Sequence, residues 1–228
     1  NVKQSINTLG DFSITQYTGS SSDGWFKHGL SGKPDWIIVK RLGQANSWPV
    51  WHSGFGGSGG TGEWILLDSN QQKGYWNEGS NGTAWNMFGT IDNTKINVMT
   101  SSSVNSAYAH ICYAWKAVSG VSAFGSYTGT GTGGFESNGN GGVNDMGFKP
   151  RWLMVKRITS GDSWTILDSF RESTTEKTTA LFANTSNTDT SSSTYGITFT
   201  TTGFTMDSGS TSGHINADGQ TYIYHAFA

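Results

Sequence analysis

The chain has 228 residues, of which 13% are charged and 13% aromatic, and its formal net charge is −2. This density of large apolar side chains argues against a charge-driven disordered tail, because too much apolar surface would remain in water. The 14 basic residues are scattered among 16 acidic ones, whereas a nucleic-acid-binding protein shows a basic stripe that neutralises phosphates. We therefore expect a globular protein with no nucleic-acid partner.

Three further features of the sequence limit the class of protein. No apolar run approaches the ~20 residues of a membrane-spanning helix, so we expect no membrane insertion. Cys112 is the only cysteine, which rules out an internal disulfide and a cysteine-based metal site, and its apolar neighbours predict a buried side chain. The sequence starts at Asn1 rather than Met, without a recognisable cleavable signal, so we expect a processed chain or part of a longer protein.

In chain order, the first half predicts short β-strands separated by glycine- and asparagine-rich turns. The run "WIIVK" (36–40) is almost continuously apolar, which is typical of a strand buried on both faces. Pro34 stands just before it, where a missing N–H costs the sheet nothing. "WPVWH" (48–52) and "KINVM" (95–99) alternate, as strands with one face on the core do. No stretch carries a sustained helical period.

The second half repeats phrases of the first. "GKPDWIIVKR" (32–41) and "FKPRWLMVKR" (148–157) share Lys, Pro, Trp, Val, Lys and Arg at the same spacing, and "YTG" (17–19) returns at 127–129. "YAHICYAW" (108–115) corresponds to "QTYIYHAF" (220–227). We interpret this pattern as a tandem duplication with its join near residues 116–126, which predicts one half at 1–118 and another at 119–228.

Strand signals every ~8–12 residues are the pattern of a β-sandwich. We therefore predict an all-β fold, a sandwich of the jelly-roll or concanavalin-lectin-like type, built from a tandem duplication of two similar halves. Two arrangements stay open at this point. The halves form two related sandwiches that pack closely together, or they form one intertwined sandwich of the lectin type, which would bury more surface per residue.

Two basic residues recur at the end of the buried strand. Lys40 and Arg41 return as Lys156 and Arg157. In a functional interpretation, these residues bind anionic sugars or phosphate. In a structural interpretation, they end a buried strand and pair with carboxylates or donate to loop carbonyls. Recurrence favours the structural interpretation, since a duplicated scaffold repeats what folding needs. We predict a pair between Arg157 and Asp168, because an isolated buried charge is costly.

The acidic residues do not form a recognisable catalytic pair. A retaining glycosidase needs two carboxyls about 5 Å apart, whereas Glu63 and Asp68 are five positions apart and would lie on opposite faces of a strand. Glu172 and Glu176 fall in a polar loop. The five histidines lack the spacing of a metal strand or helix. We expect no enzymatic activity and no cofactor, and the metal content, calcium included, stays open.

Aromatic residues outside the repeated phrases are the candidates for ligand binding. "GYWNEGSNGTAW" (74–85) has no tryptophan-bearing counterpart near residues 185–196, and "DGWFKH" (23–28) is a second such segment. Indole and phenol faces stack on sugar rings while polar neighbours bond hydroxyls. The predicted glycan-binding residues are Tyr75, Trp76, Trp85, Asn77, Glu78, Trp25 and His28. Alternatively, these rings close the end of the sandwich or are buried against a partner subunit.

A resemblance rests on the phrases "KHGLSGKPDWIIVKR", "WPVWH", "YAHICYAW", "GFKPRWLMVKR", "WTILDSFR" and "TYIYHAFA". With these, the sequence resembles a duplicated domain of unknown function found in virion-associated and tail-fibre-like proteins of bacteriophages. The likeness covers nearly the whole chain. It implies a structural protein on the virion surface, in contact with other virion subunits and forming a homo-oligomer, with a trimer expected because fibres are often trimeric. It transfers no catalytic residue.

Three functional hypotheses follow. The first is a recognition module of a tail fibre or other virion appendage, which binds a host cell-surface glycan or receptor during attachment. The second is a non-binding structural virion protein, such as a capsid decoration or fibre-assembly domain. The third is a polysaccharide depolymerase. The first two differ in whether Trp76 and Trp85 are reachable by solvent or buried against a neighbour in the assembled state.

Overall fold

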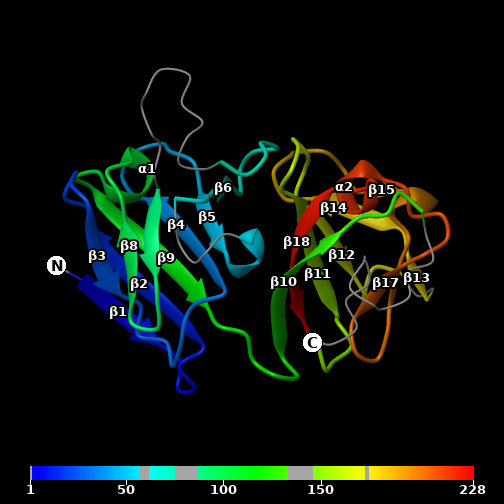
Figure 1. The fold of residues 1–228 in the computed structure, drawn as a ribbon, viewed down its shortest axis with the longest axis horizontal. Helices are drawn as coiled ribbons and strands as arrows, with labels where there is room; N and C mark the ends of the chain where they lie inside the picture. The colour runs from blue at the N-terminus through cyan, green and yellow to red at the C-terminus, as the bar shows by residue number, and fades with distance from the viewer. Residues whose placement is uncertain (1, 57–61, 75–86, 133–145, 173–174) are drawn as a thin grey trace. The chain divides into compact units, whose positions relative to one another are not determined.

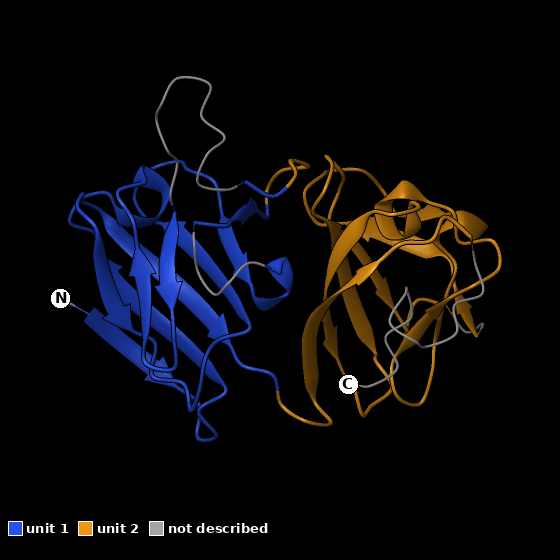
Figure 2. Ribbon diagram, in the orientation of Figure 1, with its two compact units in different colours: residues 1–67, 73–117 blue, residues 68–72, 118–228 orange. Residues whose placement is uncertain are grey.

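A computed structural model describes residues 2–56, 62–74, 87–132, 146–172 and 175–228 (Figure 1). The chain divides into two compact units (Figure 2). The first unit comprises residues 1–67 and 73–117, and the second comprises residues 68–72 and 118–228. The boundary at 117/118 lies one residue from the predicted one. Nothing in the sequence indicated that the short segment 68–72 is part of the second unit.

The first unit contains two antiparallel sheets. Its strands are β1 (Val2–Ile6), β2 (Phe12–Thr18), β3 (Gly24–Lys27), β4 (Trp36–Arg41), β5 (Pro49–His52), β6 (Ile65–Leu66), β7 (Phe88–Ile91), β8 (Lys95–Val98) and β9 (Ala109–Trp115). Among the described residues, the larger sheet has the order β1-β2-β9-β4-β5-β6 and the smaller one β3-β8-β7. The helical elements are the 3-10 turn η1 (Ser53–Phe55) and α1 (Ser102–Asn105).

The second unit is built in the same way. Its strands are β10 (Ser122–Thr128), β11 (Trp152–Arg157), β12 (Thr165–Asp168), β13 (Glu176–Lys177), β14 (Thr179–Phe182), β15 (Thr190–Ser191), β16 (Ile197–Phe199), β17 (Phe204–Met206) and β18 (Thr221–Phe227). Within the described ranges, the sheets have the orders β10-β18-β11-β12-β14-β15 and β13-β16-β17. The 3-10 turn η2 (Ser193–Tyr195) and α2 (Gly213–Asn216) complete the unit.

Each unit buries its core between its two sheets. In the second unit, Leu153 and Leu167 of the large sheet belong to one apolar cluster with Phe199 and Phe204 of the small sheet. In the first unit, the ring of Tyr17 on β2 stacks at 4.4 Å on that of Phe26 on β3. Two sheets that enclose a common core define a sandwich, so the predicted all-β sandwich class is confirmed.

The large sheets of the two units share their strand order. The order β2-β9-β4-β5-β6 has the same neighbour relations as β10-β18-β11-β12-β14. The registers agree as well, because Trp36 lies opposite Trp115 on β9, and Trp152 lies opposite Phe227 on β18. The shared strand order and register are expected from a tandem duplication. The duplication itself remains our inference from the sequence.

A buried tyrosine ties the large sheet to the short helix in each unit. The hydroxyl of Tyr17 donates to the carbonyl of Val104 in α1, and the hydroxyl of Tyr127 donates over 2.6 Å to the carbonyl of Ile215 in α2. Both helices start after a serine, Ser101 or Ser212, whose side chain accepts a main-chain N–H as an N-cap. We call this arrangement the tyrosine clamp.

An asparagine completes each tyrosine clamp. The Asn105 side-chain oxygen accepts the Ser20 amide at 3.0 Å, and the Asn216 oxygen accepts the Thr130 amide at 3.0 Å. The chain passes so close to the helix here that a Cβ at Gly19 would lie 2.1 Å from the carbonyl oxygen of Ser106. The recurring "YTG" therefore needs its glycine for this close approach.

The two central strands are buried as predicted. The three apolar residues after the tryptophan are buried in both "WIIVK" and "WLMVK". Trp36 is 7% exposed and its ring stacks at 4.3 Å on Trp115, whereas Trp152 is only half-buried and contacts the ring of Phe227 at 5.6 Å. Cys112 is buried as predicted, and burial raises the pKa of its thiol well above the usual value.

Trp36→Ala is expected to lower the free energy of unfolding by about 3–5 kcal/mol, because it leaves a cavity beneath Trp115. From the sequence alone the same loss is predicted for Trp152→Ala. Because Trp152 is only half-buried, we now expect about 1–3 kcal/mol for that variant. Urea unfolding followed by tryptophan fluorescence measures both. Equal losses would contradict the difference in burial, and a loss below about 1 kcal/mol for Trp36→Ala would contradict the packing of β4.

Candidate functional site

The structure places two of the seven predicted glycan-binding residues. Tyr75, Trp76, Asn77, Glu78 and Trp85 lie outside the described residues. Trp25 lies on β3, and His28 follows the end of this strand. Trp25 is exposed to solvent whereas His28 is buried, so the two residues have different roles.

His28 is buried, and both of its ring nitrogens are engaged within the chain. Nδ1 accepts the Leu30 amide at 3.1 Å, and Nε2 lies 3.1 Å from the carbonyl oxygen of Asp92. Burial lowers the pKa of His28, in keeping with a neutral ring that accepts at Nδ1 and donates at Nε2. The side chain therefore holds the segment after β3 against the turn between β7 and β8 and leaves no nitrogen for a ligand.

That turn is fixed by Asp92. Its Oδ1 accepts the amides of Thr94 and Lys95 at 2.8 and 2.9 Å, and also the Thr94 hydroxyl. These hydrogen bonds, those from the Thr94 and Lys95 amides first, lower the pKa of Asp92, because they favour the charged carboxylate. The position of β8 beside β3 is thus set by local main-chain contacts.

Trp25 lies on the outer face of the small sheet. Side chains alternate along a strand, so Phe26 points into the core while Trp25 is 60% exposed. Trp25 is directly opposite Asn97 on β8, and Lys27 is directly opposite Lys95. The Lys95 ammonium lies 5.6 Å from the centre of the Trp25 indole, within range of a cation–π contact. We call Trp25, Lys27, Lys95 and Asn97 the Trp25 face.

Gly89 on the neighbouring strand β7 lets the side chains of Asn97 and Met99 pack closely against it. A Cβ at Gly89 would lie 3.0 Å from the Cβ of Asn97 and 3.0 Å from the sulfur of Met99, so a larger residue would displace these side chains. The Trp25 face combines a large aromatic surface with amide and ammonium groups on a strand scaffold. This combination suits a ligand with an apolar ring face and polar substituents.

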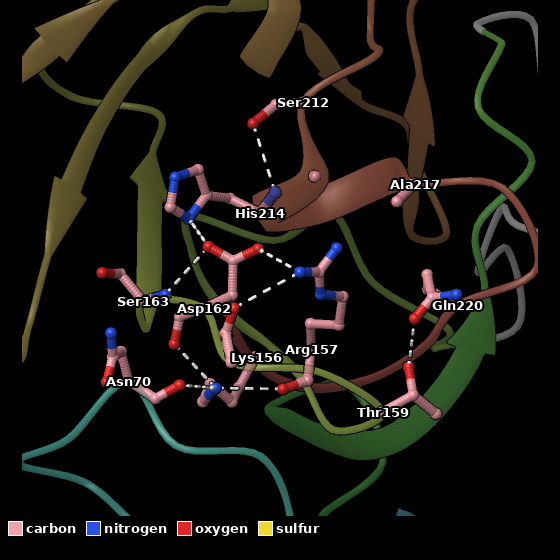
Figure 3. A network of polar contacts seen from close by, with 12 residues as sticks. Asn70, Lys156, Arg157, Thr159, Asp162, Ser163, Ser212, His214, Ala217 and Gln220 are labelled. Atoms are coloured by element: carbon pink, nitrogen blue, oxygen red, sulfur yellow. Dashed lines mark hydrogen bonds and ion pairs between the residues drawn. The ribbon is translucent and has the colours of Figure 1, made fainter.

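A second polar cluster lies at the end of β11 (Figure 3). Lys156 is buried, and its ammonium donates to the carbonyl oxygens of Asn70, Arg157 and Asp162 at 3.3, 3.0 and 2.7 Å. Burial lowers the pKa of Lys156 to about 8, since desolvation disfavours the ammonium. The charge is met by loop carbonyls, as the structural interpretation of the recurring lysine predicted.

Asp162 is the charged centre of this cluster. Its carboxylate pairs with the Arg157 guanidinium at 3.2 Å and with Nδ1 of His214, and it accepts the Ser163 amide at 3.0 Å. Burial by itself would raise the pKa of Asp162, but His214, the Ser163 amide and Arg157 together hold it below its usual value. In Figure 3 the Asp162 carboxylate lies between His214 and Arg157.

The predicted pair between Arg157 and Asp168 is wrong. Asp168 instead pairs with Arg171 at 2.6 Å and accepts the amides of Phe170 and Arg171. Arg171 is three positions after Asp168, so a turn after β12 brings them together locally. Asp162 stands in the loop directly after β11 and reaches back to Arg157 in the same way.

The first unit has the same geometry without the charges. Asn46 takes the place of Asp162, since its carbonyl accepts the Lys40 ammonium and its Oδ1 accepts the Ser47 amide at 2.8 Å. The hydroxyl of Ser103 donates to the same oxygen at 2.9 Å, where His214 contacts Asp162 in the second unit. The charged pair is therefore an addition to a scaffold that forms without it.

The acidic residues weighed for hydrolysis have partners within the chain. Glu63 pairs with Lys73 at 2.6 Å, and Glu172 accepts the amides of Thr178 and Thr179 at 2.8 and 2.9 Å. Among the described residues, no group of three or more His, Cys, Asp or Glu is arranged to hold a metal ion. Within the same ranges, none of the helices has the length and apolar character needed to cross a membrane.

The fold and the Trp25 face define the class of protein. It is an all-β protein of two sandwich units, with an exposed aromatic side chain on the small sheet of the first unit. The chain belongs to the family described as Domain of unknown function (DUF7483), whose model matches residues 1–228. No curated protein and no solved structure matches the chain.

Asp162→Asn is expected to destabilise the second unit at pH 7 by about 1–2 kcal/mol, because the amide forms no ion pair with Arg157. The pKa of Asp162 is lower in the folded chain than the value of about 4 in the unfolded chain. Its contribution is therefore present above about pH 4 and is lost as the pH falls through the folded-state pKa. Hydrogen exchange of the β11 amides at pH 7 and near pH 3 measures the difference between parent and variant.

The chain supplies a matched control for this test. Asp162→Asn/His214→Ser copies the neutral contact between Asn46 and Ser103 into the second unit. We expect this double variant to recover at least half of the stability lost by the single variant. A difference between parent and Asp162→Asn that is the same at both pH values would contradict the assigned role of the carboxylate.

Proposed function

We propose that the protein is a β-sandwich module of a phage tail fibre or other virion appendage, where it binds a host cell-surface glycan during attachment. The observation that carries this proposal is the Trp25 face. Its indole is 60% exposed on a strand whose opposite face is buried in the core. A rigid indole loses little conformational freedom on binding and offers a large surface for a sugar ring.

The phage assignment rests on the family resemblance in the sequence, and so does the location on the virion surface. In this proposal the module is non-enzymatic. The carboxylates of Glu63 and Glu172 support this view, because each is engaged with groups of the chain itself. Other virion subunits are the expected partners, and a homo-oligomer, with three chains as the expected number, is part of the proposal.

A second candidate function is a structural virion protein without a glycan ligand. The observation in its favour is Phe170, which is 95% exposed. The turn that carries it is held by the pair between Asp168 and Arg171. A fixed, fully exposed aromatic side chain is typical of an anchor that enters an apolar pocket of a protein partner. The two candidates are separated by the ligand that the isolated protein binds.

Trp25→Ala is expected to weaken glycan binding about tenfold while leaving the fold intact, because the lost ring contributes mainly stacking surface. An array of bacterial surface glycans and a host-cell binding assay provide the measurement, and circular dichroism checks the fold. Phe170→Ala is the control with another exposed aromatic residue, and it should bind glycans as the parent does.

A Trp76→Ala/Trp85→Ala variant tests the other predicted aromatic residues in the same assay. Loss of binding in this variant, with normal binding by Trp25→Ala, would move the site to residues 74–85. Absence of binding by the parent to all glycans and host cells would contradict the proposed function and favour the structural candidate.

A further inference from the structure

Two lysines lie side by side on the Trp25 face. Lys27 and Lys95 are directly opposite across β3 and β8, and the Cβ atoms of such residues are about 4.5–5.5 Å apart. Like charges in this position destabilise a sheet. In the part of the chain that the structure describes, neither ammonium forms an ion pair with a carboxylate. The scaffold thus holds two positive charges together on one exposed face.

The acidic residue nearest in sequence, Asp92, attracts Lys95 electrostatically but forms no ion pair with either lysine. Asp92 lies three residues before Lys95, and its Oδ1 is occupied by the amides of Thr94 and Lys95. The Lys95 ammonium lies instead over the Trp25 indole. A cation–π contact keeps the charge of the lysine, so the Trp25 face stays positive.

In the described part of the second unit's small sheet, β13 pairs with β16 through Glu176 opposite Thr198 and Lys177 opposite Ile197. Lys177 is buried there, and its ammonium donates to the carbonyl oxygen of Glu172 at 2.7 Å. Beside Trp25, Lys27 is instead exposed and Lys95 half-buried, and this pair of charges favours a ligand with negative charge.

We infer that the Trp25 face binds an acidic sugar, a carbohydrate residue that carries a carboxylate or a phosphate group. This inference rests on the proposed function and narrows its ligand. The apolar face of the sugar ring packs on the Trp25 indole, and the anionic group lies between the ammonium groups of Lys27 and Lys95. The two ammonium groups attract the anion, while the ring alone would accept neutral and acidic sugars alike.

The experiment compares matched polysaccharides by biolayer interferometry. Polygalacturonate and its fully methyl-esterified form share a backbone and differ in charge, and phosphomannan and mannan do so for phosphate. The bacterial glycan array supplies further acidic and neutral members. The variants are Lys27→Gln/Lys95→Gln on the face and Lys3→Gln/Lys149→Gln as a control, since Lys3 and Lys149 are also exposed and the same charge is removed.

We expect binding to acidic members only, about tenfold weaker in Lys27→Gln/Lys95→Gln and unchanged in the control. Binding by the parent should also weaken as NaCl is raised, because exposed charges are screened. Preference for carboxylate or phosphate identifies the source of the anion.

Other outcomes overturn the inference. Equal binding to the charged and neutral members of a pair, or binding to neutral glycans only, contradicts it and leaves the proposed function standing. Equal losses in the two lysine variants mean a general charge effect and also contradict it. No binding to any glycan removes the proposed function together with the inference. Melting temperatures of both variants close to that of the parent show that the fold is retained.

Discussion

The tyrosine clamp is the contact on which the rest of each unit depends. In each unit the hydroxyl of a large-sheet tyrosine, Tyr17 on β2 or Tyr127 on β10, donates to a carbonyl of the short helix. That helix follows the hairpin of the small sheet in the first unit, so the hydrogen bond joins the two sheets across the edge of the sandwich. A buried donor without its acceptor would cost about 1–3 kcal/mol, which makes the clamp specific as well as stabilising.

In the first unit the same clamp directs the chain into the candidate site. Asn105 accepts the Ser20 amide through its side chain and the Ser21 amide through its carbonyl, and its own amide donates to the carbonyl of Ser22. The chain then enters β3 at Gly24, one residue before Trp25. The path of the chain into β3 thus depends on contacts with Asn105, which lies far later in the sequence.

The ends of the central strands show how one scaffold carries different chemistry. Lys40 and Lys156 both donate to the carbonyl of a loop residue six positions later, Asn46 or Asp162. This main-chain contact is independent of the side chain at that position. The side chain is therefore free to be neutral in one unit and charged in the other, where it recruits Arg157 and His214.

Sequence reasoning predicts those features that depend on local pattern. The apolar run after Trp36 predicts a buried strand because burial on both faces leaves no room for alternation. The clamp was missed, although "S-x-x-[V/I]-N" at 101–105 and 212–216 recurs with "YTG", because its hydrogen bonds join distant segments. The partner of Arg157 was wrong because loop direction decides which aspartate is near. The prediction of His28 as a ligand residue rests on its place in the aromatic segment 23–28, and only its contacts reveal a structural role.

The position of Trp25 on a strand, rather than on a loop, has a physical consequence for recognition. Strand pairing fixes Lys27 opposite Lys95 and Trp25 opposite Asn97, so the backbone positions of the ring and of both lysines are set before any ligand arrives. Binding to a preformed face avoids most of the entropy cost of ordering a loop. The fixed backbone positions keep both lysines beside the ring, so a neutral sugar on the indole would not use their charges. A ligand with an anionic group beside an apolar ring face can contact the Trp25 indole and both lysines at once. The repulsion between Lys27 and Lys95, which destabilises the free sheet, is then offset by attraction to the anion.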